Sequence, residues 1–373
     1  MSKSSLNWVN LVFFILTPIA AVAGLIWRYQ TGTIPWETWV LAIVMFYLTG
    51  FGITAGYHRL FSHKSYKASW PVRLTLLLWG SATFEASARW WASEHRYHHQ
   101  FVDTDRDPYG INKGFWYAHI GWLVNRKDAR TDFANIADLD KDPLIKWQHR
   151  YYLPLAIIVS FGLPTFIASL WGDVWGGFFL AGMARMVFVQ HWTWCINSMA
   201  HTFGHQPYSD RHTAKDNWLA ALFTYGEGYH NFHHEFPADY RNGIRYYQYD
   251  PTKWLIRFWS YMGLVSDLKM TPQEKILEAR LMMDRKRVVR RWAIQPMYLQ
   301  AATEKIDGAM EHIRLAYQRF IILKKEYRNL KRQKLASMSQ RIVELKREMA
   351  HAKSEFKQSW DRWKILVNSP IPA

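Results

Sequence analysis

Three histidine clusters in this sequence have spacings that could bring metal ligands together. The first, His58-Arg-Leu-Phe-Ser-His63, has the pattern HxxxxH, and the clusters at 95–99 and 230–234 both have the pattern HxxHH. A helix places residues i, i+3 and i+4 on one face, so each HxxHH segment presents three imidazole rings together. Neutral imidazole is a common ligand of transition metals. The spacing therefore predicts the core of a two-metal site.

The composition limits the chemistry of such a site. Cys195 is the only cysteine among 373 residues, which excludes a disulfide framework and any four-cysteine zinc or iron–sulfur site. Eight imidazoles exceed the three or four ligands of a zinc site, and magnesium and calcium prefer oxygen. The sequence has no paired Glu-x-x-His motifs of the kind found in carboxylate-bridged di-iron bundles. Two iron ions held by imidazole and water, poised for dioxygen chemistry, fit this ligand set.

A ninth ligand is expected in the segment Asn197-Ser-Met-Ala-His201. Asn197 and His201 are four residues apart and so share a helical face. By itself such a histidine is more often an ordinary polar residue. Its position at the end of an apolar stretch, like that of His58, favours a metal ligand, with Asn197 holding a metal-bound water. No catalytic residue beyond the metal ligands is expected.

The elements that must position these residues are membrane helices. Tryptophan and tyrosine, of which the chain has 21 and 20, concentrate at membrane interfaces. The mean hydropathy of −0.24 averages an apolar front over a charged tail. Four largely apolar stretches are long enough to span a bilayer: 8–27, 38–57, 151–172 and 174–196. The first could be a signal peptide, but Trp27-Arg28 is a poor cleavage site.

Charge predicts the orientation of these spans. Basic residues crowd the 57–150 loop and the tail, whereas the loops near 28–37 and 171–174 contain only Arg28 among basic residues. The positive-inside rule then places both termini and all histidine clusters in the cytosol. The apolar segment 74–84 is too short to span and is expected to be an interfacial or buried helix. The bacterial inner membrane fits better than the endoplasmic reticulum.

The C-terminal part has a different character. Residues 1–270 are expected to form the membrane domain, and 271–373 a basic amphipathic helical extension with an antiparallel hairpin near 335–340. Residues 270–373 hold 23 Lys/Arg against 11 Asp/Glu, a net charge of about +12 out of +17. The charge is either a solvated helical face or a surface for anionic lipid headgroups or a negatively charged partner. The apolar front argues against nucleic acid as the partner.

The sequence around the histidines resembles the membrane fatty acyl desaturases, specifically the Δ9, stearoyl-CoA desaturase-like family. The resemblance covers roughly residues 8–270. The matching segments are Gly56–His63, Glu94–His99, Asn197–His201, Asp250–Trp254 and Gly226–Arg241, the last of which matches nearly verbatim.

The resemblance implies an all-α fold with four transmembrane helices under a cytosolic cap. It implies two iron ions, with a water held by Asn197. The nine matching histidine ligands are His58, His63, His95, His98, His99, His201, His230, His233 and His234. Family members use O2 to remove two hydrogens from C9 and C10 of a saturated acyl-CoA in unsaturated fatty acid biosynthesis. The sequence has neither a His-Pro-Gly-Gly haem motif nor a cysteine cluster. A separate ferredoxin, cytochrome b5-like protein or flavoprotein is therefore the expected electron donor.

The resemblance also suggests substrate contacts. Trp91 matches a tryptophan near the acyl tunnel, although an interfacial aromatic residue would fit as well. Arg126-Lys127 match cationic positions that suit phosphate contacts, although a surface basic pair would look the same. Ser93-Glu94 stand where many members have Arg-Asp, so the acyl carrier stays open between CoA, a phospholipid and a carrier protein.

Several alternatives stay open. His119 is expected either to orient ligand residues or to be structural, and His191 and His205 to orient neighbouring residues. His149, His212, His312 and His351 are expected at the surface. A histidine-box hydroxylase is the second enzymatic reading. A histidine-rich membrane metal transporter is the non-enzymatic one, but transporters need polar residues within their spans, and these clusters lie at span ends.

Overall fold

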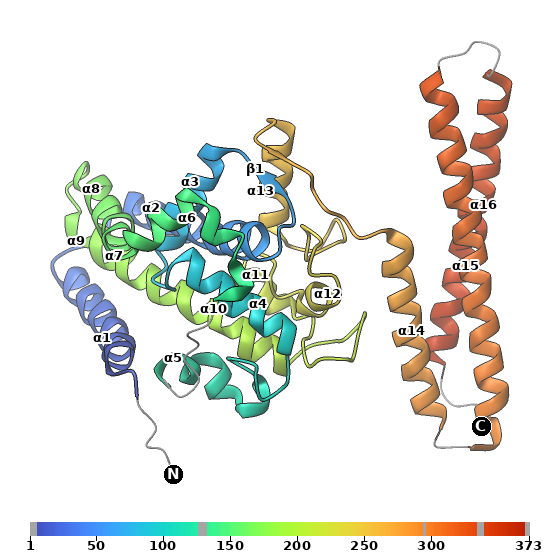
Figure 1. Ribbon diagram of the computed structural model, residues 1–373, viewed down its shortest axis with the longest axis horizontal. Helices are drawn as coiled ribbons and strands as arrows, with labels where there is room; N and C mark the ends of the chain where they lie inside the picture. The colour runs from blue at the N-terminus through green and yellow to red at the C-terminus, as the bar shows by residue number, and fades with distance from the viewer. Residues whose placement is uncertain (1–5, 126–132, 294–295, 334–338, 370–373) are drawn as a thin grey trace. The chain divides into compact units, whose positions relative to one another are not determined.

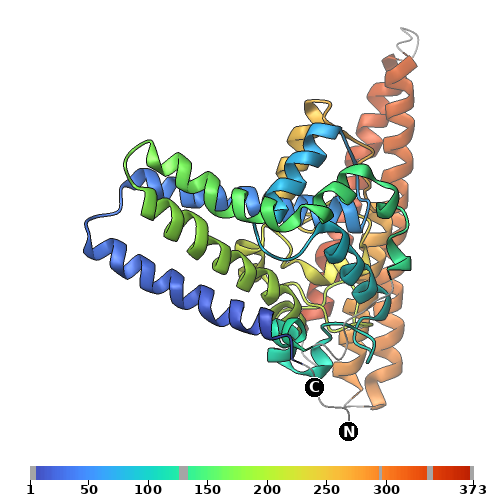
Figure 2. The same cartoon turned by 60° about the vertical axis from the view of Figure 1, so that its left-hand side comes forward.

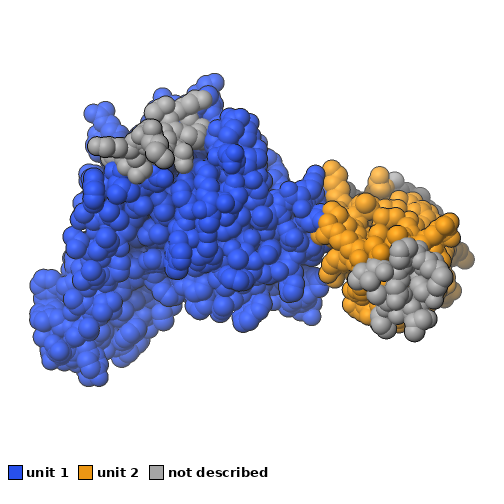
Figure 3. Space-filling view, turned by 90° about the horizontal axis from the view of Figure 1, so that it is seen from below, with its two compact units in different colours: residues 1–273 blue, residues 274–373 orange. Residues whose placement is uncertain are grey.

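The computed structural model describes residues 6–125, 133–293, 296–333 and 339–369 (Figure 1). The chain divides into two compact units, residues 1–273 and 274–373 (Figure 3). The described residues are mostly helical, as the sequence predicts. Their one sheet is a short antiparallel pair in which β1 (Lys67–Ala68) meets β2 (Val265–Ser266).

Three helical segments among the described residues are long and apolar enough to cross a membrane. They are α1 (Trp8–Gln30), α2 continued by η1 (Trp36–Phe51, then Gly52–Ser62), and α7, η7 and α8 in succession (Tyr152–Ile157, Ile158–Gly162 and Leu163–Ser169). On α1 the apolar side chains of Val9 and Ile19 are 74% and 59% exposed. A contiguous apolar surface of this kind suits lipid rather than water.

A fourth long segment is helical but less apolar. It consists of α9 (Val174–Gly176), η8 (Gly177–Ala184) and α10 (Arg185–Thr202), and it packs against α1, α2 and α8 (Figure 2). Its charged residue, Arg185, is buried and donates hydrogen bonds to the carbonyl oxygens of Ala82 (2.9 Å) and Ser160 (3.1 Å). The guanidinium therefore faces the protein interior, where an ionisable group in such a segment is least costly.

The remaining helices of the first unit surround the histidines. The helix α3 (Trp70–Ser81) has only twelve residues, and Leu76 and Leu77 on it are fully buried. It is thus the buried helix expected over 74–84. The other elements are α4 (Ala88–Phe101), η2 (Ile111–Lys113), η3 (Tyr117–Gly121), α5 (Trp122–Val124), η5 (Ala134–Ile136), η6 (Leu139–Lys141), α6 (Pro143–Arg150), α11 (Trp218–Phe223), α12 (His230–Glu235) and α13 (Pro251–Tyr261).

The second unit contains α14 (Gln273–Trp292), α15 (Pro296–Gln333) and α16 (Ser339–Asn368). Apolar residues at three- and four-residue spacing form its core, among them Ile313, Leu323 and Leu345. The helices α15 and α16 run antiparallel, which confirms the predicted hairpin. Residues 334–338, between these two helices, lie outside the described part of the chain.

Candidate metal centre

The first histidine pair converges because its backbone is a π-helix. In η1 (Gly52–Ser62) hydrogen bonds join residues five apart, and the N–H of His63 donates to the carbonyl of His58 at 3.1 Å. Residues five apart in an α-helix would point about 140° away from each other. In the wider π-helical turn the two side chains project together, and their ring centroids are 4.8 Å apart.

The second and third clusters lie on α-helices, as the HxxHH spacing predicts. Residues 95–99 belong to α4, and residues 230–234 belong to α12. The N-terminus of α4 is capped by Ser87, whose hydroxyl accepts a hydrogen bond from the N–H of Trp90. His201 comes from the last turn of α10.

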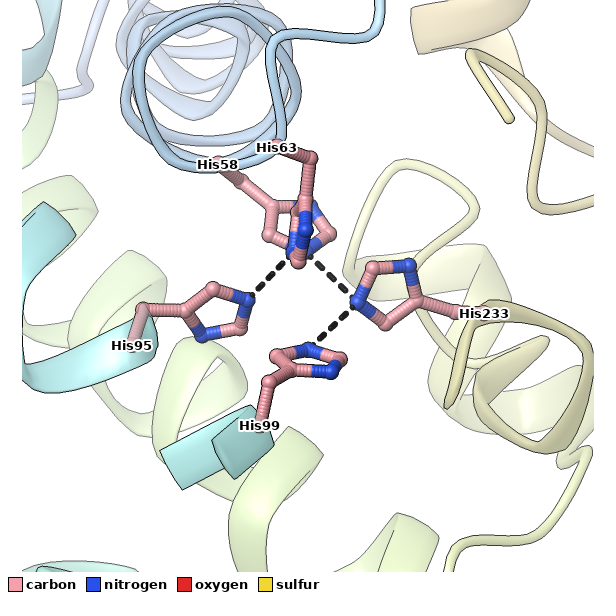
Figure 4. A group of neighbouring side chains, drawn as sticks. All are labelled: His58, His63, His95, His99 and His233. Carbon is pink, nitrogen blue, oxygen red and sulfur yellow. Dashed lines mark hydrogen bonds between the residues drawn. The ribbon is translucent and has the colours of Figure 1, made fainter. Parts of the chain in front are cut away.

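All nine predicted histidines meet in two groups. In each group the ligand nitrogens lie within 4.8 Å of one another. Figure 4 shows the first group, in which rings from three separate segments point toward one centre. The first group is His58, His63, His95, His99 and His233, and the second is His98, His201, His230 and His234.

The spacing of the nitrogens fits a bound transition metal. In the first group the Nε2 atoms of His63 and His95 are 2.8 Å apart, and those of His58 and His233 are 3.0 Å apart. In the second group the Nε2 atoms of His230 and His201 are 3.1 Å apart. Imidazole nitrogens bind metals at about 2.1 Å, so two ligands at right angles lie about 3 Å apart. These pairs therefore have the spacing that two ligands of one metal ion require.

Burial favours the protonation state that binds metal. Burial and the neighbouring histidines lower the pKa of His95, His99, His230, His233 and His234 well below the usual value. These rings are therefore neutral at physiological pH. A neutral ring leaves one nitrogen free to coordinate a metal.

Several ligand rings are fixed by partners on their other nitrogen. The Nδ1 of His98 lies 2.9 Å from a carboxylate oxygen of Asp107, and the Nδ1 of His58 lies 2.8 Å from Glu227. The Nδ1 atoms of His95 and His201 contact the hydroxyls of Tyr109 (3.2 Å) and Thr213 (2.7 Å). Such partners hold a metal-facing imidazole in the correct tautomer and orientation.

A buried ion network supports the His58 partner. Arg59 donates to Glu227 at 2.9 Å and to Asp250 at 3.0 Å, and all three side chains are at least 97% buried. Although burial alone would raise it, the pKa of Glu227 is lowered by Arg59 and His58. The carboxylate therefore stays ionised beside His58. Sequence analysis missed Glu227, Asp107, Tyr109 and Thr213 because nothing in their spacing marks them as partners of histidine.

An apolar cavity of about 660 Å³ reaches the metal groups. Its walls come from α1, α4, α10 and the segments between them. They include aromatic residues such as Phe13, Phe84 and Trp122. His58, His95, His230 and Asn197 line the cavity as well, so a ligand in it would meet both groups.

Trp91 and Glu85 line the same cavity. The Trp91 ring stacks on His95 with centroids 4.9 Å apart, and its Nε1–H donates to Glu85 at 3.4 Å. Enclosure by the cavity walls raises the pKa of Glu85 to about 8. Glu85 had no signal in the sequence, because a single acidic residue after an apolar stretch is common.

Other candidate residues lie in different surroundings. Arg126 and Lys127 lie outside the described residues. His119 and His191 contact each other (3.1 Å between Nε2 and Nδ1), and His119 also contacts Ser198.

Two positions near the histidine clusters also stand out. His212 was expected at the surface, which is wrong: it is half-buried, with its ring centroid 5.1 Å from that of His234. A folded loop brings it there, and this is invisible in the sequence. Ser93, where the resemblance would place an arginine, is buried and donates to Asn135.

The fold and site define a helical protein with membrane-length apolar helices and two all-histidine metal-binding groups. A family model described as fatty acid desaturase matches residues 34–264. The chain belongs to the fatty acid desaturase family, which confirms the resemblance of its motifs.

Curated relatives agree with this family. A probable acyl-CoA desaturase of Schizosaccharomyces pombe is 44% identical over 289 residues, covering 77% of this chain and 59% of that protein. Acyl-CoA desaturase 1 of Saccharomyces cerevisiae is 44% identical over 288 residues, with coverages of 76% and 56%. Delta(9)-fatty-acid desaturase fat-7 of Caenorhabditis elegans is 40% identical over 281 residues, with coverages of 74% and 82%. The chain thus spans less than two thirds of the length of the first two relatives.

Proposed function

We propose that this chain is an O2-dependent acyl desaturase that introduces a cis double bond between C9 and C10 of a saturated acyl-CoA, in unsaturated fatty acid biosynthesis. In the overall reaction the CH2–CH2 unit loses two hydrogens, and O2 takes these hydrogens, two electrons and two protons to give two waters. The observation that carries the proposal is the pair of all-histidine groups at the wall of one apolar cavity. Relatives named as acyl-CoA desaturases support the substrate class.

We assign desaturation to residues 1–270 and two iron ions to the two histidine groups. Iron suits nitrogen-rich sites that activate dioxygen, which supplies the oxidising power for unactivated C–H bonds. The protein positions the chain and excludes water: the aromatic walls hold the alkyl segment, and Trp91 stacks on His95 at the cavity wall. We assign Asn197, one helical turn before His201 on α10, to holding a metal-bound water.

We propose that four helical segments, the fourth being 174–202, cross a membrane beneath a cytosolic cap. The burial and internal hydrogen bonds of Arg185 support a span that turns its charge inward. The membrane is then a bacterial inner membrane, and both termini and the metal groups lie on its cytosolic side. Arg126 and Lys127 are assigned to the CoA phosphates, and a separate ferredoxin, cytochrome b5-like protein or flavoprotein supplies electrons.

Expression in a desaturase-deficient host, followed by location of double bonds in the acyl chains, tests the function. Cis-9 alkenes are expected from the wild-type chain. His98→Ala should abolish them while the protein stays in the membrane, because His98 belongs to the second metal group. Hydroxylated chains would instead identify a hydroxylase. A protein that contains no iron and forms no product would point to a metal-transport or anchoring role.

A further inference from the structure

The second unit lies outside the residues that the family model matches, and it is strongly basic. Its helices α15 and α16 turn their apolar faces toward each other along a seam. Charged residues therefore flank this seam along two edges, one on each side of the apolar core.

On one edge, arginine and glutamate side chains form ion pairs. Arg319 contacts Glu355 at 3.2 Å, and Arg341 contacts Glu326 at 3.0 Å and Glu348 at 2.8 Å. The contacts of Arg319 with Glu355 and of Arg341 with Glu326 join the two antiparallel helices and show their register, whereas Arg341 and Glu348 both lie on α16. We call this side the paired edge.

The opposite side carries only positive charge at its flanking positions. Heptad spacing around the core residues Phe320 and Leu323 places Lys324 on the side away from Arg319. The register set by the paired edge then puts Lys324 opposite Lys346. We call this side the cationic edge, and its residues are Lys324, Lys331, Lys346 and Lys353. Within the described part of the chain, none of the four has an ion-pair partner.

Facing lysines repel each other, so the unit gains no stability from this edge. An anionic partner would remove the repulsion. Four large apolar side chains are exposed on the described parts of α15 and α16: Leu315, Ile322, Val343 and Ile365. By heptad position Leu315, Ile322 and Ile365 lie on the side of the paired edge, and Val343 alone lies beside the cationic edge. Helices that lie on a membrane surface instead present an apolar strip beside their cations. The edge therefore fits an acidic protein better than a lipid surface.

We propose that the cationic edge docks an acidic one-electron carrier protein that supplies the electrons for desaturation. The inference rests on the proposed function, which consumes two electrons for each double bond. The single cysteine of this sequence cannot hold a four-cysteine iron–sulfur cluster, and we infer that the electrons come from a separate carrier protein. A docking unit joined to the catalytic unit raises the effective concentration of that carrier, and complementary charge speeds its association.

The test uses the full chain in nanodiscs of neutral phosphatidylcholine, with an acidic [2Fe–2S] ferredoxin as the probe. The edge variant is Lys324→Gln/Lys346→Gln/Lys353→Gln. The matched control, Lys275→Gln/Lys305→Gln/Arg362→Gln, removes the same charge from exposed residues of the same unit away from the cationic edge. At low salt the ferredoxin concentration for half-maximal product formation should rise about tenfold in the edge variant and at most about twofold in the control. The maximal rate should be unchanged.

A second reductant separates a failure of the proposed function from a failure of the docking proposal. In a single-turnover assay, dithionite and methyl viologen reduce the protein without O2, excess reductant is removed, and O2 and acyl-CoA are then added. Wild type and both variants should form equal amounts of alkene. No alkene from the wild type under these conditions would contradict the proposed function. Alkene formation with equal half-saturation by ferredoxin in both variants would overturn the docking proposal alone. In a parallel series of nanodiscs that contain phosphatidylglycerol, an increase in wild-type activity that the edge variant alone loses, with unchanged half-saturation by ferredoxin, would assign the edge to lipid and also overturn the docking proposal.

Discussion

The histidines that face the metal positions depend on residues that never touch the metal. Asp107 shows this clearly, because it is buried and holds the Nδ1 of His98 while also accepting hydrogen bonds from the N–H groups of Asp103 and Tyr109. We expect Asp107→Asn to weaken metal retention by about 10- to 100-fold, since the amide no longer stabilises the required tautomer. Iron content after titration with a chelator measures this. Asp105→Asn, an exposed neighbour, is the control, and equal retention in both variants would contradict the assignment.

Glu85 gives the site a dependence on pH. Its pKa of about 8 lies above the ordinary value near 4.5, so the folded protein holds this proton more tightly than the unfolded chain. Stability therefore falls as pH rises from about 4.5 to 8, where the carboxylate must ionise inside the cavity. Glu85→Gln removes this penalty. We expect Glu85→Gln to raise the thermal-unfolding midpoint relative to wild type, and to raise it more at pH 8.5 than at pH 5. An equal difference in midpoint at both pH values would argue against the raised pKa.

At the scale of elements, a close helix contact holds the π-helix that carries His58 and His63. A Cβ atom at Gly52 would lie 2.1 Å from the backbone nitrogen of Gly80, on α3. We expect Gly52→Ala to destabilise the protein by about 1–3 kcal/mol, because a backbone cannot yield as a flexible side chain can. Gly162→Ala is a matched control, since Gly162 also lies in a π-helical segment and its Cβ would meet no atom within 4 Å. Equal unfolding midpoints for the two variants would contradict this packing argument.

An α-helix was predictable wherever apolar residues or histidines recur at three- and four-residue steps. The HxxHH clusters lie on α-helices because three- and four-residue steps match the α-helical turn. The HxxxxH cluster has a five-residue step, which becomes useful only in the wider turn of η1. A π-helix has no strong local sequence preference, and packing against α3 holds it in place, so sequence reasoning could not identify it.

At the scale of the whole molecule, the proposed topology places both termini in the cytosol. In a Cys195→Ser background, Thr33→Cys reports the loop between α1 and α2, and Ser354→Cys reports the second unit. Both positions are exposed. In spheroplasts an impermeant maleimide should label Cys at 33 immediately and Cys at 354 only after lysis. Labelling of both, or of 354 alone, in intact spheroplasts would refute the topology.

The sequence by itself determined the nine candidate ligands, the helical character of the chain and its family. These follow from residue chemistry and local spacing, which do not depend on distant contacts. Only the tertiary structure decided how the ligands divide into groups of five and four, because each group draws on segments far apart in the chain. It also decided which carboxylates fix the ligand rings and that His212 lies beside His234, since long-range packing creates these contacts.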